Sequence, residues 1–304
     1  MINMLYPIKI LLSNKYLFNK RYLFYFLLIV LGRQYGFALK PNPIYSETPH
    51  QYCSLCNVIV EDVTFITKDG ITLTGWFFKP DTCTFKRPTV IVAGPDKGNM
   101  GDLLFYTNVL SNNINVLLFD YRGFGKSGTW PIDTTALIYP EFITDLEAAL
   151  KYVKTRRDVD STNLGLFGLS MGTILCVGVA AKHPEIKVLV ADGMVTSTTD
   201  IIAIQKAKNR FIYVPGGYPT NYEPINAIKN TKHCKVFIVA GDKDTNTPLW
   251  MAKKIYEVAP NKGELWVIKG AKHLEGPYAV DYKTYIKKTN DFYSDLLRKW
   301  PVFK

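Results

Sequence analysis

A serine stands at the centre of the pattern Gly168-Leu169-Ser170-Met171-Gly172, between a short apolar run and a helix-length segment. On a tight turn between a strand and a helix, a serine projects its hydroxyl above the sheet, and small flanking residues leave room for the turn. The helix start also presents a positive dipole to developing negative charge. This context predicts a nucleophile at Ser170. The alternative interpretation is a glycine-rich helix start with Ser170 as its N-cap.

A serine hydroxyl becomes a useful nucleophile only when a base removes its proton and an acid orients that base. The chain has four histidines, and His273 follows the last predicted strand through residues 270–272, at its carboxyl end. The others, His50, His183 and His233, are interpreted as surface or capping residues. His273 is therefore the predicted base, with an ordinary loop histidine as the alternative.

Two carboxylates follow the predicted strand at residues 236–240, in the sequence Gly-Asp-Lys-Asp-Thr-Asn-Thr-Pro at 241–248. The order serine, aspartate, histidine along the chain is the one that strand-to-helix nucleophile turns use. Asp244 is the predicted acid. Asp242 is an alternative that also fits a turn-shaping role, because aspartate commonly bonds backbone in such loops. Asp192, at the end of the preceding predicted strand, is a further candidate.

The elements that must position these residues alternate between short apolar runs and helix-length segments. The runs are 89–93, 116–119, 164–167, 188–191, 236–240 and 265–268, and the segments are 139–155, 171–182, 249–258 and 281–300. Residues 58–66 and 71–78 flank Asp69-Gly70, a hairpin signal. The pattern predicts an α/β fold with a doubly wound, mostly parallel sheet and an N-terminal antiparallel hairpin. Ligands of such sheets bind at the carboxyl ends of the strands.

Over residues 57–300 the chain resembles the α/β-hydrolase superfamily, specifically its serine-aminopeptidase-like and dienelactone-hydrolase-like branch. In chain order, the matching motifs are EDVTFITKDGITLTGWF, DYRGFGKSG, GLSMG, GDKDTNTP and GAKH, which is also their order in that family. The resemblance implies that Ser170, Asp244 and His273 are nucleophile, acid and base. It also implies that the backbone N–H of Met171 is one oxyanion donor.

One loop departs from the pattern of that branch, whose members usually carry His-Gly-x-x-Gly-Asn after the strand that ends here at Ala93. This chain has Gly94-Pro95-Asp96-Lys97-Gly98-Asn99. Proline has no N–H to donate, so the second oxyanion donor is predicted to be the N–H of Asp96 or a neighbour. Loss of one such donor costs about 10² to 10³ in rate, which favours a weak or inactive enzyme as an alternative.

The amino-terminal 40 residues carry six cations and no acidic residue, which leaves only +5 of the formal charge of +11 for the other 264 positions. That remainder is too dilute to indicate nucleic-acid binding. Residues 22–31 are an apolar run after Lys20 and Arg21. The run predicts membrane association through residues 20–39 as a single-pass anchor, with a cleaved signal or a packed helix on a cytoplasmic protein as alternatives.

The predicted domains are the basic and apolar segment 1–40, a proline-bearing connector 41–56, and a hydrolase domain 57–304 with a short cap at about 194–232. The Gly-rich stretch 123–128 is interpreted as a loop and not as a dinucleotide site, because Trp130 and Pro131 oppose a helix start there. His50, Cys53 and Cys56 resemble half a zinc site, but a disulfide involving Cys53, Cys56 or Cys83 is the favoured interpretation outside the cytoplasm, and Cys176 is predicted to be core.

The sequence therefore predicts a serine hydrolase that needs no cofactor or metal and cleaves an ester, thioester or amide by acyl transfer. The favoured activity is that of a carboxylesterase or thioesterase on a small-molecule or lipid-like acyl substrate, in a membrane-anchored or extracytoplasmic protein. The alternatives are an aminopeptidase-like peptidase and a catalytically silent binding protein.

Overall fold

The computed structural model describes residues 39–49, 58–80, 86–107 and 114–297. The strands are β1 (Lys40–Pro41), β2 (Val58–Ile66), β3 (Thr72–Pro80), β4 (Arg87–Ala93), β5 (Lys97–Gly98), β6 (Asn115–Phe119), β7 (Val159–Leu169), β8 (Ile186–Asp192), β9 (Lys235–Gly241) and β10 (Lys262–Ile268). The helices are η2 (Met100–Leu103), α4 (Leu104–Thr107), α5 (Glu141–Thr155), α6 (Met171–Ala180), α7 (Thr198–Ala207), α8 (Pro224–Ala227), η3 (Ile228–Asn230), α9 (Leu249–Val258), α10 (Gly276–Ala279) and α11 (Tyr282–Leu297).

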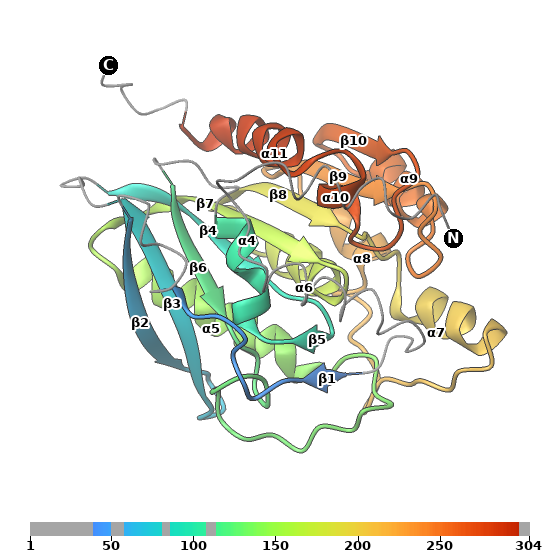
Figure 1. Cartoon of the computed structure of the whole chain (residues 1–304), viewed down its shortest axis with the longest axis horizontal. Helices are drawn as coiled ribbons and strands as arrows, with labels where there is room; N and C mark the ends of the chain where they lie inside the picture. Colours follow the sequence, from blue (N-terminus) through green and yellow to red (C-terminus); the bar gives the residue numbers. More distant parts are fainter. Residues whose placement is uncertain (1–38, 50–57, 81–85, 108–113, 298–304) are drawn as a thin grey trace, which may run out of the picture. The chain divides into compact units, whose positions relative to one another are not determined.

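Eight of the described strands form one sheet in the order β10-β9-β8-β7-β4-β6-β3-β2 (Figure 1). Neighbours from β10 to β6 are parallel, whereas β3 runs antiparallel to both β6 and β2. β2 and β3 form the predicted hairpin, closed by a turn in which Gly70 has a φ of +89°. The predicted fold class, a doubly wound and mostly parallel sheet with an N-terminal antiparallel hairpin, is confirmed.

Helices cover both faces of this sheet, which explains why its central strands are apolar throughout. Successive residues of β4 point to opposite faces, so Ile91 belongs to one buried core and Val92 to the other. The first core includes buried side chains of α5, α6 and α9, and the second includes those of α4 and α11. All ten residues of α6 are buried, so this helix is fixed on every side.

The described residues before β2 pack onto the domain. Leu39 is fully buried, and β1 pairs in parallel with β5 beside it (Figure 1). The first part of the predicted connector 41–56 thus contacts the hydrolase domain as far as residue 49, and residues 50–57 lie outside the described residues. The predicted basic and apolar segment lies outside them up to residue 38. Among the described residues, no helix has both the length and the apolar character needed to cross a membrane.

The region predicted as a cap contains α7, α8 and η3. Ser197 caps the start of α7 by accepting from the Asp200 N–H. The segment after α7 is tied to the domain by Leu137, whose N–H donates to the Tyr213 carbonyl (2.8 Å). The Lys208 ammonium at the end of α7 donates to the Thr245 carbonyl (2.6 Å), so this region reaches the loop after β9.

Candidate active site

Ser170 is the one residue between β7 and α6. Its φ of 51° and ψ of −113° place it in a conformation that residues other than glycine rarely adopt. Its N–H donates to the Asp192 carbonyl (2.9 Å), and its carbonyl accepts from the Thr173 N–H (2.8 Å). Because neighbouring strands and the helix hold both sides of the peptide, the sharp turn persists despite its strain.

The two glycines around Ser170 are required by close backbone approaches. A Cβ atom on Gly172 would lie 2.1 Å from the Ala93 carbonyl oxygen, and one on Gly168 would lie 2.9 Å from the Gly172 carbonyl oxygen. The Gly-x-Ser-x-Gly pattern therefore lets the first turn of α6 press directly against the end of β4. The same contact brings the loop after β4 next to the serine turn.

The structure brings together the three side chains predicted as nucleophile, base and acid. The His273 Nε2 lies 2.9 Å from the Ser170 Oγ, and the His273 Nδ1 lies 2.7 Å from the Asp244 Oδ2. The three residues follow the carboxyl ends of β7, β10 and β9, at one edge of the sheet. With a proton on Nδ1, the imidazole donates to Asp244 and accepts from the serine hydroxyl, which is the arrangement that general-base activation of serine needs.

The buried carboxylate of Asp244 accepts four described hydrogen bonds. Its Oδ1 accepts from the N–H groups of Asn246 (2.7 Å) and Thr247 (2.9 Å). Its Oδ2 accepts from the Thr247 Oγ1 (2.8 Å) as well as from His273. Four donors on two oxygens fix the carboxylate so that it orients the imidazole.

The electrostatics of the pair follow from this geometry. Burial alone raises the pKa of Asp244, but the charge of His273 and the hydrogen bonds of the cluster outweigh it and leave that pKa below its usual range. Burial alone lowers the pKa of His273, but the Asp244 carboxylate outweighs it and raises that pKa above 6.5. The carboxylates of Asp96 and Asp192 raise it further. The imidazolium that forms when serine gives up its proton is therefore stabilised.

The two alternative acids have other partners. The Asp242 Oδ1 accepts from the Gly270 N–H (2.6 Å), so this exposed side chain ties the loop after β9 to the loop that leads to His273. The Asp192 Oδ2 accepts from the Tyr285 hydroxyl (2.7 Å) on α11, and burial raises the pKa of Asp192 to about 6. Of the three candidates, Asp244 is the one with a described hydrogen bond to His273.

Two backbone N–H groups were predicted as oxyanion donors. Met171 is the first residue of α6, so its N–H has no acceptor within the helix. Asp96 lies in the loop after β4, where its carbonyl accepts from the Lys40 N–H (2.9 Å). Its carboxylate is near enough to His273 to raise the pKa of that histidine. The role of these two N–H groups as oxyanion donors stays a prediction.

Comparison with known proteins identifies the family. Residues 104–298 match the prolyl oligopeptidase family. The chain belongs to that family. It is also 30% identical over 271 residues to the uncharacterized protein YfhR of Salmonella typhi, covering 82% of this chain and 84% of that protein. The α/β-hydrolase domain-containing protein WAV2 of Arabidopsis thaliana is 25% identical over 220 residues, covering 67% of this chain and 68% of that protein.

Solved structures share the fold. The esterase Pf2001 of Pyrococcus furiosus superposes with a TM-score of 0.64 at 22% identity, covering 84% of this chain and 99% of that one. A putative dipeptidyl aminopeptidase IV of Bacteroides ovatus superposes with a TM-score of 0.61 at 20% identity, covering 82% of this chain but 37% of that one. The superfamily predicted from the sequence is confirmed: this prolyl oligopeptidase family member is an α/β hydrolase with esterase-like and peptidase-like neighbours.

Two other histidines of this family member, His183 and His233, make structural contacts, and His50 lies outside the described residues. His183 bridges Glu147 (2.7 Å) on α5 and Glu185 (3.4 Å), and the His233 Nε2 lies 2.9 Å from the Ala180 carbonyl. Cys176 is fully buried in α6, as predicted. Among the described residues, no group of three or more His, Cys, Asp or Glu side chains is placed to hold a metal. The half zinc site and the predicted disulfide cysteines lie outside the described residues.

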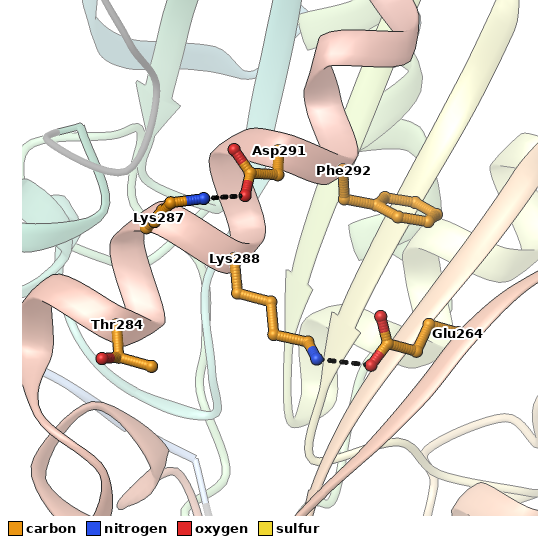
Figure 2. A pocket seen from close by; sticks show the side chains of 6 residues that line it. All are labelled: Glu264, Thr284, Lys287, Lys288, Asp291 and Phe292. Atoms are coloured by element: carbon orange, nitrogen blue, oxygen red, sulfur yellow. Dashed lines mark hydrogen bonds and ion pairs between the residues drawn. The ribbon is translucent and has the colours of Figure 1, made fainter.

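A hollow between α11 and β10 is lined by none of Ser170, Asp244 and His273. It has a volume of about 470 Å³ and is lined by Glu264, Thr284, Lys287, Lys288, Asp291 and Phe292 (Figure 2). Its charges are already matched, because Lys288 pairs with Glu264 and Lys287 pairs with Asp291, both at 2.5 Å. The hollow contains none of the predicted site residues, and nothing in it indicates chemistry.

Sequence reasoning missed several residues that support the site. Thr247 donates to Asp244 and its Oγ1 lies 3.2 Å from the His273 Nδ1. Tyr285 holds Asp192, and Lys40 holds the loop of Asp96. Thr247 lies in the same loop as Asp242 and Asp244, so its hydroxyl could have been predicted as a donor to the catalytic carboxylate. Tyr285 and Lys40 come from distant segments whose contacts leave no spacing pattern in the sequence.

Proposed function

We propose that this chain is a serine hydrolase that cleaves carboxylic esters or thioesters by acyl transfer. Ser170 is the nucleophile, His273 the general base and Asp244 the acid that orients it. The observation that carries the proposal is the continuous relay of 2.9 Å from the Ser170 Oγ to the His273 Nε2 and 2.7 Å from the Nδ1 to Asp244. Membership of a hydrolase family supports the same reaction class.

In the first half of the reaction, His273 takes the hydroxyl proton while the Ser170 Oγ bonds to the substrate carbonyl carbon. The carbonyl oxygen becomes an oxyanion, which the N–H groups of Met171 and Asp96 stabilise at the start of α6. The imidazolium then gives its proton to the leaving alcohol or thiol as the carbon–oxygen or carbon–sulfur bond breaks. An acyl ester of Ser170 remains.

In the second half, water replaces the leaving group. His273 takes a proton from that water as its oxygen bonds to the acyl carbon, and the same two N–H groups stabilise the second oxyanion. When the tetrahedral species collapses, the Ser170 Oγ leaves and recovers the proton from the imidazolium. The net reaction is hydrolysis to a carboxylic acid, and the resting relay is restored.

Apolar side chains on the segments around the relay support an apolar acyl substrate. Trp250 (44% exposed) is the second residue of α9, just after the Asp244 loop, and Tyr278 (58% exposed) lies on α10 just after His273. Phe211 (84% exposed) follows α7 close to Lys208, which bonds the Asp244 loop. We expect these aromatics to contribute to one contiguous apolar patch, the kind of exposed surface that often marks a binding site. By contrast, Tyr222 packs against α6 at Gly178 and is unsuited to an acyl pocket.

A peptidase is the second candidate, because the family is that of prolyl oligopeptidases and one structural neighbour is a putative dipeptidyl aminopeptidase IV. The same relay cleaves an amide if His273 protonates a leaving amine. However, the superposition covers 37% of that neighbour's chain, so the likeness extends only to that part of it.

The test is hydrolysis by the full chain of p-nitrophenyl esters of increasing acyl length, acyl thioesters, and aminoacyl and prolyl p-nitroanilides. Ser170→Ala removes the nucleophile, and Ser161→Ala, the same change at the other end of β7, is the matched control. The proposal expects ester or thioester turnover that Ser170→Ala abolishes and Ser161→Ala keeps. Preferred turnover of the anilides assigns the peptidase instead, and turnover that survives Ser170→Ala refutes both candidates.

A further inference from the structure

Residues 39–46 form a strap that runs beside the loop after β4. Leu39 anchors the strap, because its side chain is fully buried and its N–H donates to the Ala136 carbonyl (3.3 Å). Ile44, on the same strap, is 73% exposed. Burial of apolar area therefore fixes one end of the strap, and polar contacts must hold the rest.

The polar contacts of the strap go to the loop of residues 94–99. β1 of the strap pairs in parallel with β5 of that loop. The Lys40 N–H donates to the Asp96 carbonyl (2.9 Å), and the Asn42 N–H donates to the Gly98 carbonyl (3.0 Å). The loop is therefore held at two carbonyls, one on each side of Lys97.

Asn99 fastens the far end of the same loop. This buried side chain donates through Nδ2 to the carbonyls of Asn42 (3.0 Å) and Ile44 (2.8 Å), both on the strap. Its Oδ1 accepts from the Gly101 N–H (2.9 Å) and so caps η2. One amide thereby joins the strap to the helix that follows the loop.

Asp120, just after β6, adds a third connection. One carboxylate oxygen accepts from the Tyr45 hydroxyl of the strap, and the other accepts from the Met100 N–H (2.7 Å) at the start of η2. The strap and the element that follows the loop thus share one buried acceptor. The hydrogen bonds of Asn99 and Asp120 therefore connect the strap to the start of η2, directly after the loop.

The opposite side of the loop rests on the serine turn. The Gly94 carbonyl oxygen lies 2.8 Å from where a Cβ of Gly172 would be, beside the Ala93 carbonyl. The Tyr121 hydroxyl also donates to the Gly94 carbonyl (3.2 Å). The loop is therefore clamped between the strap on one side and the first turn of α6 on the other.

We propose that the strap is a positioning element of the catalytic centre: the Lys40 N–H and the Asn99 side chain hold the loop so that the Asp96 N–H meets the oxyanion. The proposal rests on the function proposed above. An oxyanion donor must lie about 2.7 to 3.1 Å from the oxyanion. The loop contains two glycines, Gly94 and Gly98, and Gly98 has a φ of +80°. Glycine makes its backbone pliable, so external hydrogen bonds must define that distance.

The experiment compares Lys40→Pro with Lys40→Ala in the full chain. Proline deletes the N–H that bonds Asp96 and tolerates an extended edge position, whereas alanine removes the same side chain and keeps the N–H. Relative to Lys40→Ala, we expect Lys40→Pro to lower kcat for a p-nitrophenyl ester about 10- to 100-fold with KM changed less than about twofold, because full loss of a donor costs about 10² to 10³. The inhibition constant of a boronic acid, which forms a tetrahedral adduct, should rise in parallel.

Asn99→Asp is the second variant, because it keeps the acceptor that caps η2 and replaces the two donations to the strap with a carboxylate facing carbonyls. If Lys40→Pro does not fold, Asn99→Asp still tests whether the strap positions the loop. A selective loss of kcat and of boronic acid affinity in a folded variant supports the strap. Unchanged kcat in a folded Lys40→Pro or Asn99→Asp, with Ser170→Ala inactive, overturns the strap and leaves the hydrolase proposal intact. Activity that survives Ser170→Ala overturns the hydrolase proposal itself.

Discussion

Replacing Asp244 with asparagine changes one acceptor oxygen into an N–H₂ donor within a cluster that contains only donors. The Oδ1 of Asp244 accepts from the N–H groups of Asn246 and Thr247, and its Oδ2 accepts from the Thr247 hydroxyl and the His273 Nδ1. If the asparagine keeps its oxygen on the two backbone N–H groups, its amide donates to Nδ1. The imidazole proton then sits on Nε2, facing Ser170, and His273 cannot accept the serine proton.

The magnitude follows from the cost of the other orientation. To keep the productive tautomer, the asparagine must turn its oxygen to His273 and leave two buried backbone donors without acceptors. Each unsatisfied buried donor costs about 1 to 3 kcal/mol, so the productive form lies about 2 to 6 kcal/mol higher. At about 1.36 kcal/mol for each factor of ten, Asp244→Asn should lower kcat roughly 30- to 25,000-fold.

The assay is steady-state hydrolysis of a short p-nitrophenyl ester by the full chain, with thermal unfolding to check that the variant is folded. Asp242→Asn is the matched control, because this exposed carboxylate bonds only the Gly270 N–H among its described contacts. We expect it to change kcat less than about threefold, because asparagine keeps an oxygen that can accept from the Gly270 N–H. A loss below about threefold for a folded Asp244→Asn, or equal losses in the two variants, refutes the reasoning.

Gly172→Ala should destabilise the protein by about 1 to 3 kcal/mol and lower kcat, since its Cβ would meet the backbone of Ala93; Gly178→Ala, which meets a movable tyrosine ring, should cost less in denaturant unfolding. The pH profile of kcat/KM should rise through the pKa of His273, at a midpoint above about 6.5, because only the neutral imidazole accepts a proton; a midpoint below 6.5 contradicts the role of Asp244. The hydrogen bond to Glu147 raises the pKa of His183. Its stabilisation is present below about pH 6.5 and is lost as pH rises through the folded pKa, so His183→Gln should lower Tm more at about pH 6 than at about pH 9.

The sheet could be predicted from the sequence because its central strands are buried on both faces. The run at 116–119 became β6 and the segment at 249–258 became α9 with almost no change of bounds. The hairpin was equally clear, because Asp69-Gly70 separates two strands of nine residues each. Burial on both faces leaves unbroken apolar runs, and a single sequence shows such runs directly.

The relay could be predicted because the topology constrains it. Parallel strands deliver Ser170, Asp244 and His273 to one edge, so the residues just past each strand were the ones to inspect. The choice among Asp192, Asp242 and Asp244 could not be made from spacing. It depends on which donors lie nearby, and these come from loops and from Tyr285 on α11.

The strap could not be predicted, because a two-residue parallel pairing has no periodicity of its own. Prolines at residues 41 and 43 instead gave the segment the composition of a connector. Its hydrogen bonds join Lys40 to Asp96 and Asn42 to Gly98, across more than fifty positions. Long-range backbone contacts of irregular segments are set by the finished fold and leave no local signal in the sequence.

The central claim is that Ser170 is activated by His273. It is tested most directly by treating the folded full chain with a fluorophosphonate and locating the adduct by mass spectrometry. The account predicts a single adduct on Ser170 that forms in the unmodified chain and disappears when His273 is replaced by alanine. An adduct on another residue, unchanged labelling in His273→Ala, or no labelling of the folded protein contradicts it.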